Sequence, residues 1–166
     1  MIACIDVLYD DTNLSGRVAC VVFEDWFAAV PSHELALTVG NVLPYVPGEF
    51  YKRELPCIQA ILDRLPALPE TIIVDGYVWL DESQSPGLGG HLFHQLDRKI
   101  QVVGVAKNRY AKATNATEIL RGDSKKPLYI TAAGIEQTVA ARLVKDMHGE
   151  HRYPTLLKRV DVLSRT

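Results

Sequence analysis

The amino-acid sequence predicts an α/β fold, a mixed sheet flanked by helices, and two observations carry that prediction. The chain opens with two strand-like segments joined by a polar turn, which is typical of an antiparallel hairpin. Further on, residues 71–74 and 102–106 form short, continuously apolar segments of the kind buried on both faces of a sheet. A helical segment separates them, so they are expected to pair in parallel through a right-handed crossover.

The hairpin is predicted from residues 2–8 and 17–24, which are rich in β-branched residues, with the polar turn at residues 10–16 between them. Residues 25–29 are predicted to extend or restart this pairing as a third strand. Residues 31–40 are ambiguous between a strand and an irregular segment.

Helical spacing of apolar residues begins after a loop at residues 43–49. The residues that follow this spacing are Leu55, Ile58, Ile61, Leu62 and Leu65. A helix of about three turns is therefore predicted, and Pro66 and Pro69 mark its exit because proline removes a backbone donor.

The second half of the chain continues the alternation of strands and helices. Residues 88–96 are predicted to form a helix after a glycine-rich turn, and residues 107–126 form a polar loop with some short structure. Residues 128–131 follow as a last strand, with helical segments at 137–147 and 154–163. No repeat or linker divides the chain, so residues 1–166 are predicted to form a single domain.

Composition limits the class of protein. The chain has 166 residues, of which 48% are hydrophobic and 23% charged, as is usual for a globular protein. The formal charge of −2 argues against a uniformly basic surface but allows a local basic groove for nucleic acid. Cys4, Cys20 and Cys57 are scattered among apolar residues and are predicted to be buried free thiols of a reducing compartment. Without a leader segment or an apolar run of about 18 residues, the expected location is the cytoplasm and no membrane partner is expected.

Three acidic residues in or near short apolar runs give the first indication of function. Asp6 lies within IACIDVLY, Glu54 follows PYVPG at the start of the predicted helix, and Asp75 directly follows TIIV. A carboxylate at the end of a buried strand is costly to desolvate unless it is paired, solvated or bound to a cation. A shared metal site is therefore predicted, although each aspartate could instead cap a helix or a turn, as Asp75 before Gly76 could do.

The motifs around these residues resemble the endonuclease V family. The resemblance rests on IACIDVLY, PYVPGEFYKRE, IIVDGY, GLGGHL and VVGVAKNRY, in this order and at suitable spacings. It covers roughly residues 2–110, with a weaker similarity at residues 128–143. The PYVPG segment followed by Arg-Glu, together with Gly-Val-Ala-Lys, is specific in combination, whereas each motif alone is weak.

The resemblance implies a ribonuclease H-like fold and a nuclease that cuts a phosphodiester near deaminated purines, chiefly inosine, in DNA or RNA. It implies Mg²⁺ or Mn²⁺ as cofactor, held by Asp6, Glu54 and Asp75, which would also be the central catalytic residues. Oxygen ligands suit Mg²⁺, and such a cation activates the attacking water and offsets charge on the departing oxygen.

Further residue roles follow from the same resemblance. Lys107 would approach the scissile phosphate, and His91 would lie near the same cleft as a further catalytic residue. Tyr45 would act as a wedge that fills the gap left by the extruded base. The residues expected to contact nucleic acid with it are Pro44, Val46, Pro47, Gly48 and Gly76.

Simpler roles remain open for several of these side chains. Tyr45 between prolines could cap the core, Lys107 could be a solvated lysine, and His91 could be a packed or capping histidine. His91 and His94 have the spacing of a zinc pair on a helix, but no third ligand stands at a supporting spacing.

Three departures from the family pattern bear on activity. The family has His-Pro-Arg shortly after Asp-Gly, where this chain reads YVWLDE, and a histidine after Ser-Pro-Gly, where this chain reads TAAG. The helical segment that usually precedes the first strand does not precede Ile2. Asp81 or Glu136 could supply an additional ligand.

Three functions are consistent with these residues. The first is a metal-dependent endonuclease acting on inosine-containing or structured nucleic acid, as in nucleic-acid repair. The second is a divergent, catalytically weak or inactive member that binds nucleic acid without cutting it, which the missing histidines favour. The third is a metal-dependent phosphatase or small-molecule hydrolase that uses the same carboxylates.

Overall fold

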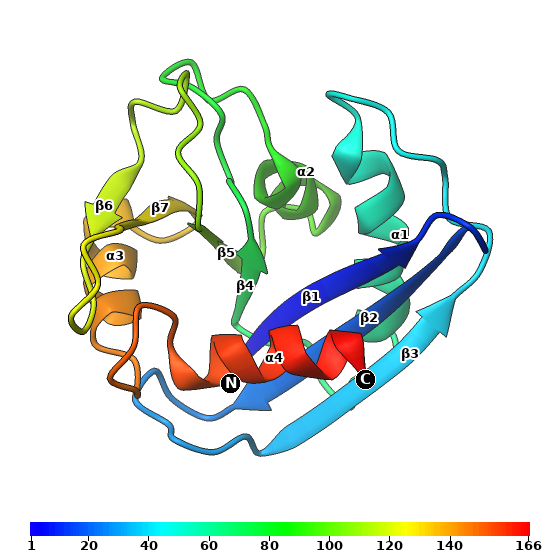
Figure 1. The fold of residues 1–166 in the computed structure, drawn as a ribbon, viewed down its shortest axis with the longest axis horizontal. Helices are drawn as coiled ribbons and strands as arrows, with labels where there is room; N and C mark the ends of the chain where they lie inside the picture. The colour runs from blue at the N-terminus through cyan, green and yellow to red at the C-terminus, as the bar shows by residue number, and fades with distance from the viewer.

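Seven strands form one sheet in the order β3-β2-β1-β4-β5-β7-β6 in the computed structural model, which describes residues 1–166 (Figure 1). The strands are β1 (Ile2–Asp10), β2 (Ser15–Phe23), β3 (His33–Val39), β4 (Thr71–Asp75), β5 (Gln101–Ala106), β6 (Thr117–Ile119) and β7 (Leu128–Ala133). The helices are α1 (Phe50–Leu62), α2 (Leu88–Gln95), α3 (Gln137–Lys145) and α4 (Thr155–Arg165).

The sheet is mixed, as the sequence predicts. β1, β2 and β3 form an antiparallel meander at one side, and β4 and β5 join β1 in parallel. β7 and β6 complete the other side with antiparallel pairing. The predicted parallel pair with a crossover helix is confirmed, since α2 connects β4 to the neighbouring β5.

The structure corrects one prediction for the first half of the chain, decides one ambiguous segment and moves the start of one helix. Residues 25–29 are not a strand, because the Asp25 carboxylate accepts a hydrogen bond from the Phe27 N–H and holds a turn. The ambiguous segment 31–40 contains β3 instead, whose Leu35 and Leu37 pack against the core on alternate positions. The helix α1 also begins earlier than its apolar spacing indicates, at Phe50.

The structure agrees with the predictions for the polar segment 107–126 and for the three cysteines. The segment is mostly irregular but contributes the short strand β6, which pairs with β7. Cys4, Cys20 and Cys57 are buried and unpaired. None of the four helices combines the length and apolar character needed to cross a membrane.

Helices cover both faces of the sheet, and the alternation of side chains along each strand divides the core in two. One core lies beneath α3 and α4 and includes Cys4 and Ile73, while the other lies beneath α1 and α2 and includes Ile5 and Val74. Because side chains alternate along a strand, every second residue from Cys4 and Ile73 points to the α4 face. This alternation decides on which face of the sheet the strand-end carboxylates lie.

Candidate active site

Asp6, Asp75 and Lys107 leave the sheet on the same face, the one that α4 covers. Each follows by two positions a residue of the core beneath α3 and α4, so its side chain points the same way. β4 ends at Asp75, whereas β1 continues to Asp10 paired only with β2. Asp6 therefore faces the space beyond the end of β4, and the strand-end placement predicted from the sequence is confirmed for Asp75 and Lys107.

The turn after Asp75 depends on Gly76. Its φ of 117° lies in the region that side chains rarely adopt, and its N–H donates a hydrogen bond to the carbonyl of Val105 at 3.1 Å. The chain thus turns away over β5 immediately after the carboxylate, which leaves the end of β4 accessible.

Glu54 approaches from α1 with a buried but unpaired carboxylate. The side chain is only 6% exposed, and its Oε2 atom has no hydrogen-bond partner. Burial, together with the negative charges of Asp6 and Asp75, raises the pKa of Glu54 well above its usual value. A buried carboxylate oxygen without a partner is costly, so this side chain is poised to accept a proton or a cation.

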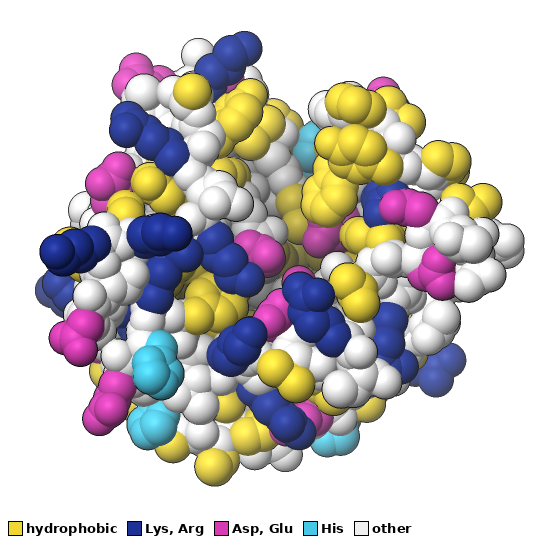
Figure 2. All heavy atoms as spheres, viewed as in Figure 1, with side chains coloured by type: hydrophobic (Ala, Val, Ile, Leu, Met, Phe, Trp, Pro, Cys, Tyr) yellow, Lys and Arg dark blue, Asp and Glu magenta, His cyan; other side chains and the backbone are white.

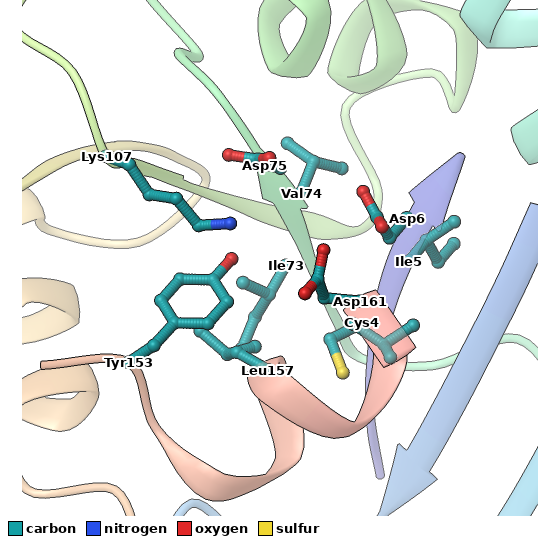
Figure 3. A pocket seen from close by; sticks show the side chains of 11 residues that line it. Cys4, Ile5, Asp6, Ile73, Val74, Asp75, Lys107, Tyr153, Leu157 and Asp161 are labelled. Carbon is teal, nitrogen blue, oxygen red and sulfur yellow. The ribbon is translucent and has the colours of Figure 1, made fainter. Parts of the chain in front are cut away.

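Asp161, on α4, joins the same pocket and was missed by the sequence reasoning. It lines a pocket of about 10 Å³, the size of one water molecule, together with Asp6, Asp75, Lys107 and Tyr153 (Figure 3). One sequence signal could have identified it. On an amphipathic helix, Asp161 shares the buried face with apolar residues such as Leu157, where an acidic residue is unexpected.

The electrostatic environments of Asp75 and Asp161 differ. Burial raises the pKa of Asp75, and the charge of Lys107 only partly opposes this effect. Burial likewise disfavours ionisation of Asp161, but hydrogen bonds from Lys158 and Arg165 outweigh it and lower the pKa of Asp161. Asp161 is therefore ionised more readily than Asp75.

Several carboxylate oxygens are held by neighbouring side chains. The hydroxyl of Ser164, a fully buried residue of α4, donates a hydrogen bond to Asp6 Oδ2 at 2.8 Å. Asp161 is held by Lys158 and Arg165 at 3.0 and 3.1 Å. As the side chains lie, no three His, Cys, Asp or Glu residues form a group that could hold a metal ion. The acidic residues share one pocket region, but their oxygens do not converge on one point.

An apolar hollow of about 370 Å³ opens beside Asp75. It is within the size range of small-ligand pockets, about 300–1,000 Å³. Aromatic side chains form much of its wall, and Gly48 and Gly76 contribute backbone. The aromatic residues are Phe50, Tyr51, Tyr77 and Tyr110. A flat, apolar ring system would fit such a wall next to the carboxylates.

The PYVPG loop lies at the rim of this hollow. Tyr45 is 57% exposed and contacts Phe50 edge to face, with ring centroids 6.2 Å apart. Pro47 and Gly48 form a turn, with the Gly48 φ of 81° and a hydrogen bond from the Glu49 N–H to the Val46 carbonyl. Tyr45 therefore does not cap the core.

The surface around the site is divided by side-chain type. Figure 2 shows hydrophobic side chains clustered on the lobe above α1, across a hollow from several Lys and Arg side chains. The exposed apolar residues of the loop and the start of α1 are Leu43, Tyr45, Val46 and Phe50. A local basic region thus exists on a chain whose formal charge is −2.

His91 lies behind the hollow and lines neither it nor the carboxylate pocket. Its ring stacks on Tyr51 with centroids 3.6 Å apart, and burial lowers its pKa. Asp81 accepts a hydrogen bond from the Ser85 N–H within its own turn, and Glu136 is exposed before α3. Neither carboxylate lines the pocket, whereas Asp161 does.

The segment that departs from the family pattern after Asp75 has a bracing role. The Tyr77 hydroxyl donates to the Asn108 carbonyl and accepts from the Tyr110 N–H, which ties the loops after β4 and β5 together. The indole N–H of Trp79 donates to the Ala132 carbonyl. These contacts fix one wall of the hollow.

Comparison with known proteins identifies the family. The profile of the Endonuclease V family matches residues 1–147. The chain belongs to the Endonuclease V family. An Endonuclease V of Streptomyces coelicolor is 34% identical over 139 residues, which are 83% of this chain and 57% of that protein. The chain therefore spans little more than half the length of this relative. An Endonuclease V of Streptomyces avermitilis is 29% identical over 97% of this chain and 77% of its own length.

Solved Endonuclease V structures share the fold. The crystal structure of the Streptomyces avermitilis protein superposes with a TM-score of 0.79 at 25% identity, covering 99% of this chain and 79% of that one. Ciona intestinalis Endonuclease V, solved with a 24mer DNA containing an inosine followed by a ribo-adenosine, gives a TM-score of 0.80 at 20% identity, covering 99% and 84%. The ribonuclease H-like fold predicted from the resemblance is confirmed.

Proposed function

We propose that this protein is a divalent-metal-dependent endonuclease that cuts nucleic acid near deaminated purines such as inosine. One observation carries the proposal. Four carboxylates and the Lys107 ammonium lie near one another where β4 and β5 end beside β1, next to an aromatic hollow. The carboxylates are those of Asp6, Glu54, Asp75 and Asp161.

The donor set supports Mg²⁺ or Mn²⁺ as cofactor. Carboxylate oxygens are the ligands that these cations prefer, and the unpaired Glu54 Oε2 together with the raised pKa values of Glu54 and Asp75 indicates unsatisfied negative charge. Asp6, Glu54 and Asp75 would hold the cation, after side-chain rotations that bring their oxygens together. When bound, the cation would stabilise charge on the phosphate and lower the pKa of the attacking water.

The remaining residues support nucleic acid as the partner. Lys107 offers a point charge to a phosphate, and the hollow beside Asp75 offers stacking surfaces to an extruded base. Tyr45 is exposed and contacts Phe50 of the hollow, and with Pro44, Val46 and Pro47 it would fill the space that the base leaves. The inosine-containing DNA bound by the Ciona intestinalis relative is consistent with this substrate class.

A second candidate function is binding without cleavage. It is favoured by the ion pairs that hold the oxygens of Asp161, by the lack of three carboxylates already grouped around one point, and by the segments YVWLDE and TAAG in place of the family histidines. In that case the aromatic hollow and the basic region would serve recognition alone.

Cleavage of labelled strands separates the two candidates. Single-stranded and duplex DNA and RNA, with and without one inosine, would be incubated with the protein and Mg²⁺, Mn²⁺ or a chelator, beside an Asp75→Ala variant. The expected result is inosine-dependent cutting that needs the cation and is lost in the variant. Binding without cutting would support the second candidate, and cutting that persists in Asp75→Ala would remove the proposed cation site.

The hydrogen bond from Ser164 to Asp6 leads to a specific prediction. Ser164→Ala removes one oxygen from a fully buried site and leaves Asp6 free to rotate. Because partners of metal ligands typically affect cation affinity or activity by about 10- to 100-fold, the Mg²⁺ concentration for half-maximal cleavage should rise by about tenfold. Ser124→Ala, on an outer loop, is the matched control and should leave that midpoint unchanged. An unchanged midpoint in Ser164→Ala would show that Asp6 needs no such support.

A further inference from the structure

Lys107 lies in an acidic pocket, yet it forms no ion pair. None of the salt bridges of the protein includes it, although its positive charge favours the ionised forms of both Asp75 and Asp161. The Nζ atom instead lies 4.4 Å from the centroid of the Tyr153 ring. Its N–H groups make no hydrogen bond within the protein, so they remain available to a ligand.

Tyr153 faces the pocket from the segment just before α4. Its ring packs against the core beneath α3 and α4, and its hydroxyl points into the space between Lys107 and Asp161 (Figure 3). No hydrogen bond joins this hydroxyl to another protein group. Burial, together with the neighbouring carboxylates, raises the pKa of Tyr153, which keeps the hydroxyl protonated and able to donate.

The backbone supports the same arrangement. The guanidinium of Arg152 donates hydrogen bonds to the carbonyls of Lys107 and Pro127, at 2.5 and 2.8 Å. The segment that carries Tyr153 is therefore anchored to the backbone of Lys107 itself, directly after β5, and to that of Pro127, just before β7.

The ring has a physical consequence for the acidic pocket. A lysine side chain next to two aspartates would otherwise be drawn into an ion pair, which would occupy carboxylate oxygens and ammonium donors alike. An aromatic face attracts the ammonium without using a hydrogen-bond donor. With this contact, neither the Lys107 ammonium nor the Asp75 carboxylate has a hydrogen-bond partner within the protein, so both are available to a ligand.

We propose that Tyr153 is a positioning residue, whose ring holds Lys107 ready for a phosphate group and whose hydroxyl donates a second hydrogen bond to that phosphate. The inference rests on the proposed function, because the phosphate belongs to a nucleic-acid substrate. Tyr153 lies outside every motif that carries the family resemblance, so its role follows from the tertiary structure alone.

Two substitutions separate the ring from the hydroxyl. Tyr153→Leu removes both and is expected to lower kcat/KM for an inosine-containing strand by about tenfold, whereas Tyr153→Phe keeps the ring contact and should cost only about threefold. In a Lys107→Met background, Tyr153→Leu should add less than about twofold, because the ring then has no ammonium to hold. Equal losses in both backgrounds would overturn the proposal in favour of a structural role. Tyr129→Leu on β7 is the control, and thermal unfolding checks that each variant folds.

A measurement without catalysis tests the contact directly. In the NMR spectrum, the ε-methylene protons of Lys107 should be shifted upfield by the Tyr153 ring, in the wild type and in Tyr153→Phe but not in Tyr153→Leu. An unshifted wild-type signal would overturn the inference. A shifted signal in a protein that does not cut would instead count against the proposed nuclease function, and Tyr153→Leu should then still weaken oligonucleotide binding.

Discussion

Glu54→Gln is expected to abolish cleavage and at the same time to stabilise the cation-free protein. The substitution removes a buried charge whose Oε2 atom has no partner and which the carboxylates of Asp6 and Asp75 repel. Substitutions that remove a destabilising functional group commonly increase the free energy of unfolding by about 1–2 kcal/mol. Activity should fall by about a thousandfold or more, because groups that act as one catalytic unit lose their effect together.

The pH dependence of stability should change in the same variant. Since the pKa of Glu54 is raised in the folded protein, the folded state binds more protons than the unfolded state, and the stability of the cation-free wild type falls as pH rises above the ordinary carboxyl range near about 4. The stability of Glu54→Gln should not show this part of the decrease with rising pH. Mg²⁺ binding needs the ionised carboxylates, so its affinity for the wild type should rise with pH over the same interval.

Thermal unfolding with and without Mg²⁺ at several pH values checks both expectations. Mg²⁺ should raise the Tm of the wild type and have little effect on Glu54→Gln. Glu118→Gln, an exposed position on β6, serves as the control and should behave as the wild type. A Glu54→Gln protein that is less stable than the wild type, yet equally stabilised by Mg²⁺, would contradict the assignment of Glu54.

Among substitutions of buried residues outside the candidate active site, Arg121→Met should cause the largest loss of stability. Arg121 is only 5% exposed, and its guanidinium donates hydrogen bonds to five backbone carbonyls, one at the end of α3 and four in the segment between α3 and α4, with no carboxylate among its partners. Removing it leaves these buried carbonyls without donors. Each buried carbonyl left without a donor typically costs about 1–3 kcal/mol, so the Tm should fall by roughly 10 °C for a chain of this size.

The same substitution should affect activity through α4. The segment that Arg121 holds leads into the helix that carries Asp161 and Ser164, so a loosened segment should also weaken cation binding. Arg142→Met, an exposed position on α3, is the control for the loss of a positive charge. Calorimetric unfolding of both variants tests this role, because equal Tm values would show that Arg121 does not hold the segment between α3 and α4 in place.

The sequence predicted the local features because each depends on neighbouring residues. Two continuously apolar segments indicated β4 and β5, and helical spacing indicated α1. Residues 25–29 were predicted wrongly as a strand, since β-forming residues were present but the Asp25 side chain holds a turn. β3 was ambiguous, because an edge strand buries little of its surface and its composition is less distinctive.

For the candidate site, too, some residues could be placed from the sequence and others could not. Asp6, Asp75 and Lys107 could be placed from their positions in or after apolar strands, because parallel strands bring their carboxyl ends to one edge. Asp161 and Tyr153 could not be placed, because nothing in the local sequence of α4 shows that this helix lies over β1. Asp81 and Glu136 were weighed as additional ligands from their proximity to motifs, yet neither lines the pocket.

The sequence by itself determined the fold class and the family and pointed to Asp6, Glu54 and Asp75 as candidate site residues, since these inferences depend on periodicity and on motifs of adjacent residues. Only the tertiary structure showed that Asp161 of α4 lines the pocket, that Ser164 donates a hydrogen bond to Asp6, and that the Lys107 ammonium lies over the Tyr153 ring. The physical reason is the separation along the chain: these contacts join residues up to 158 positions apart, and only the packing of α4 on the sheet brings them together.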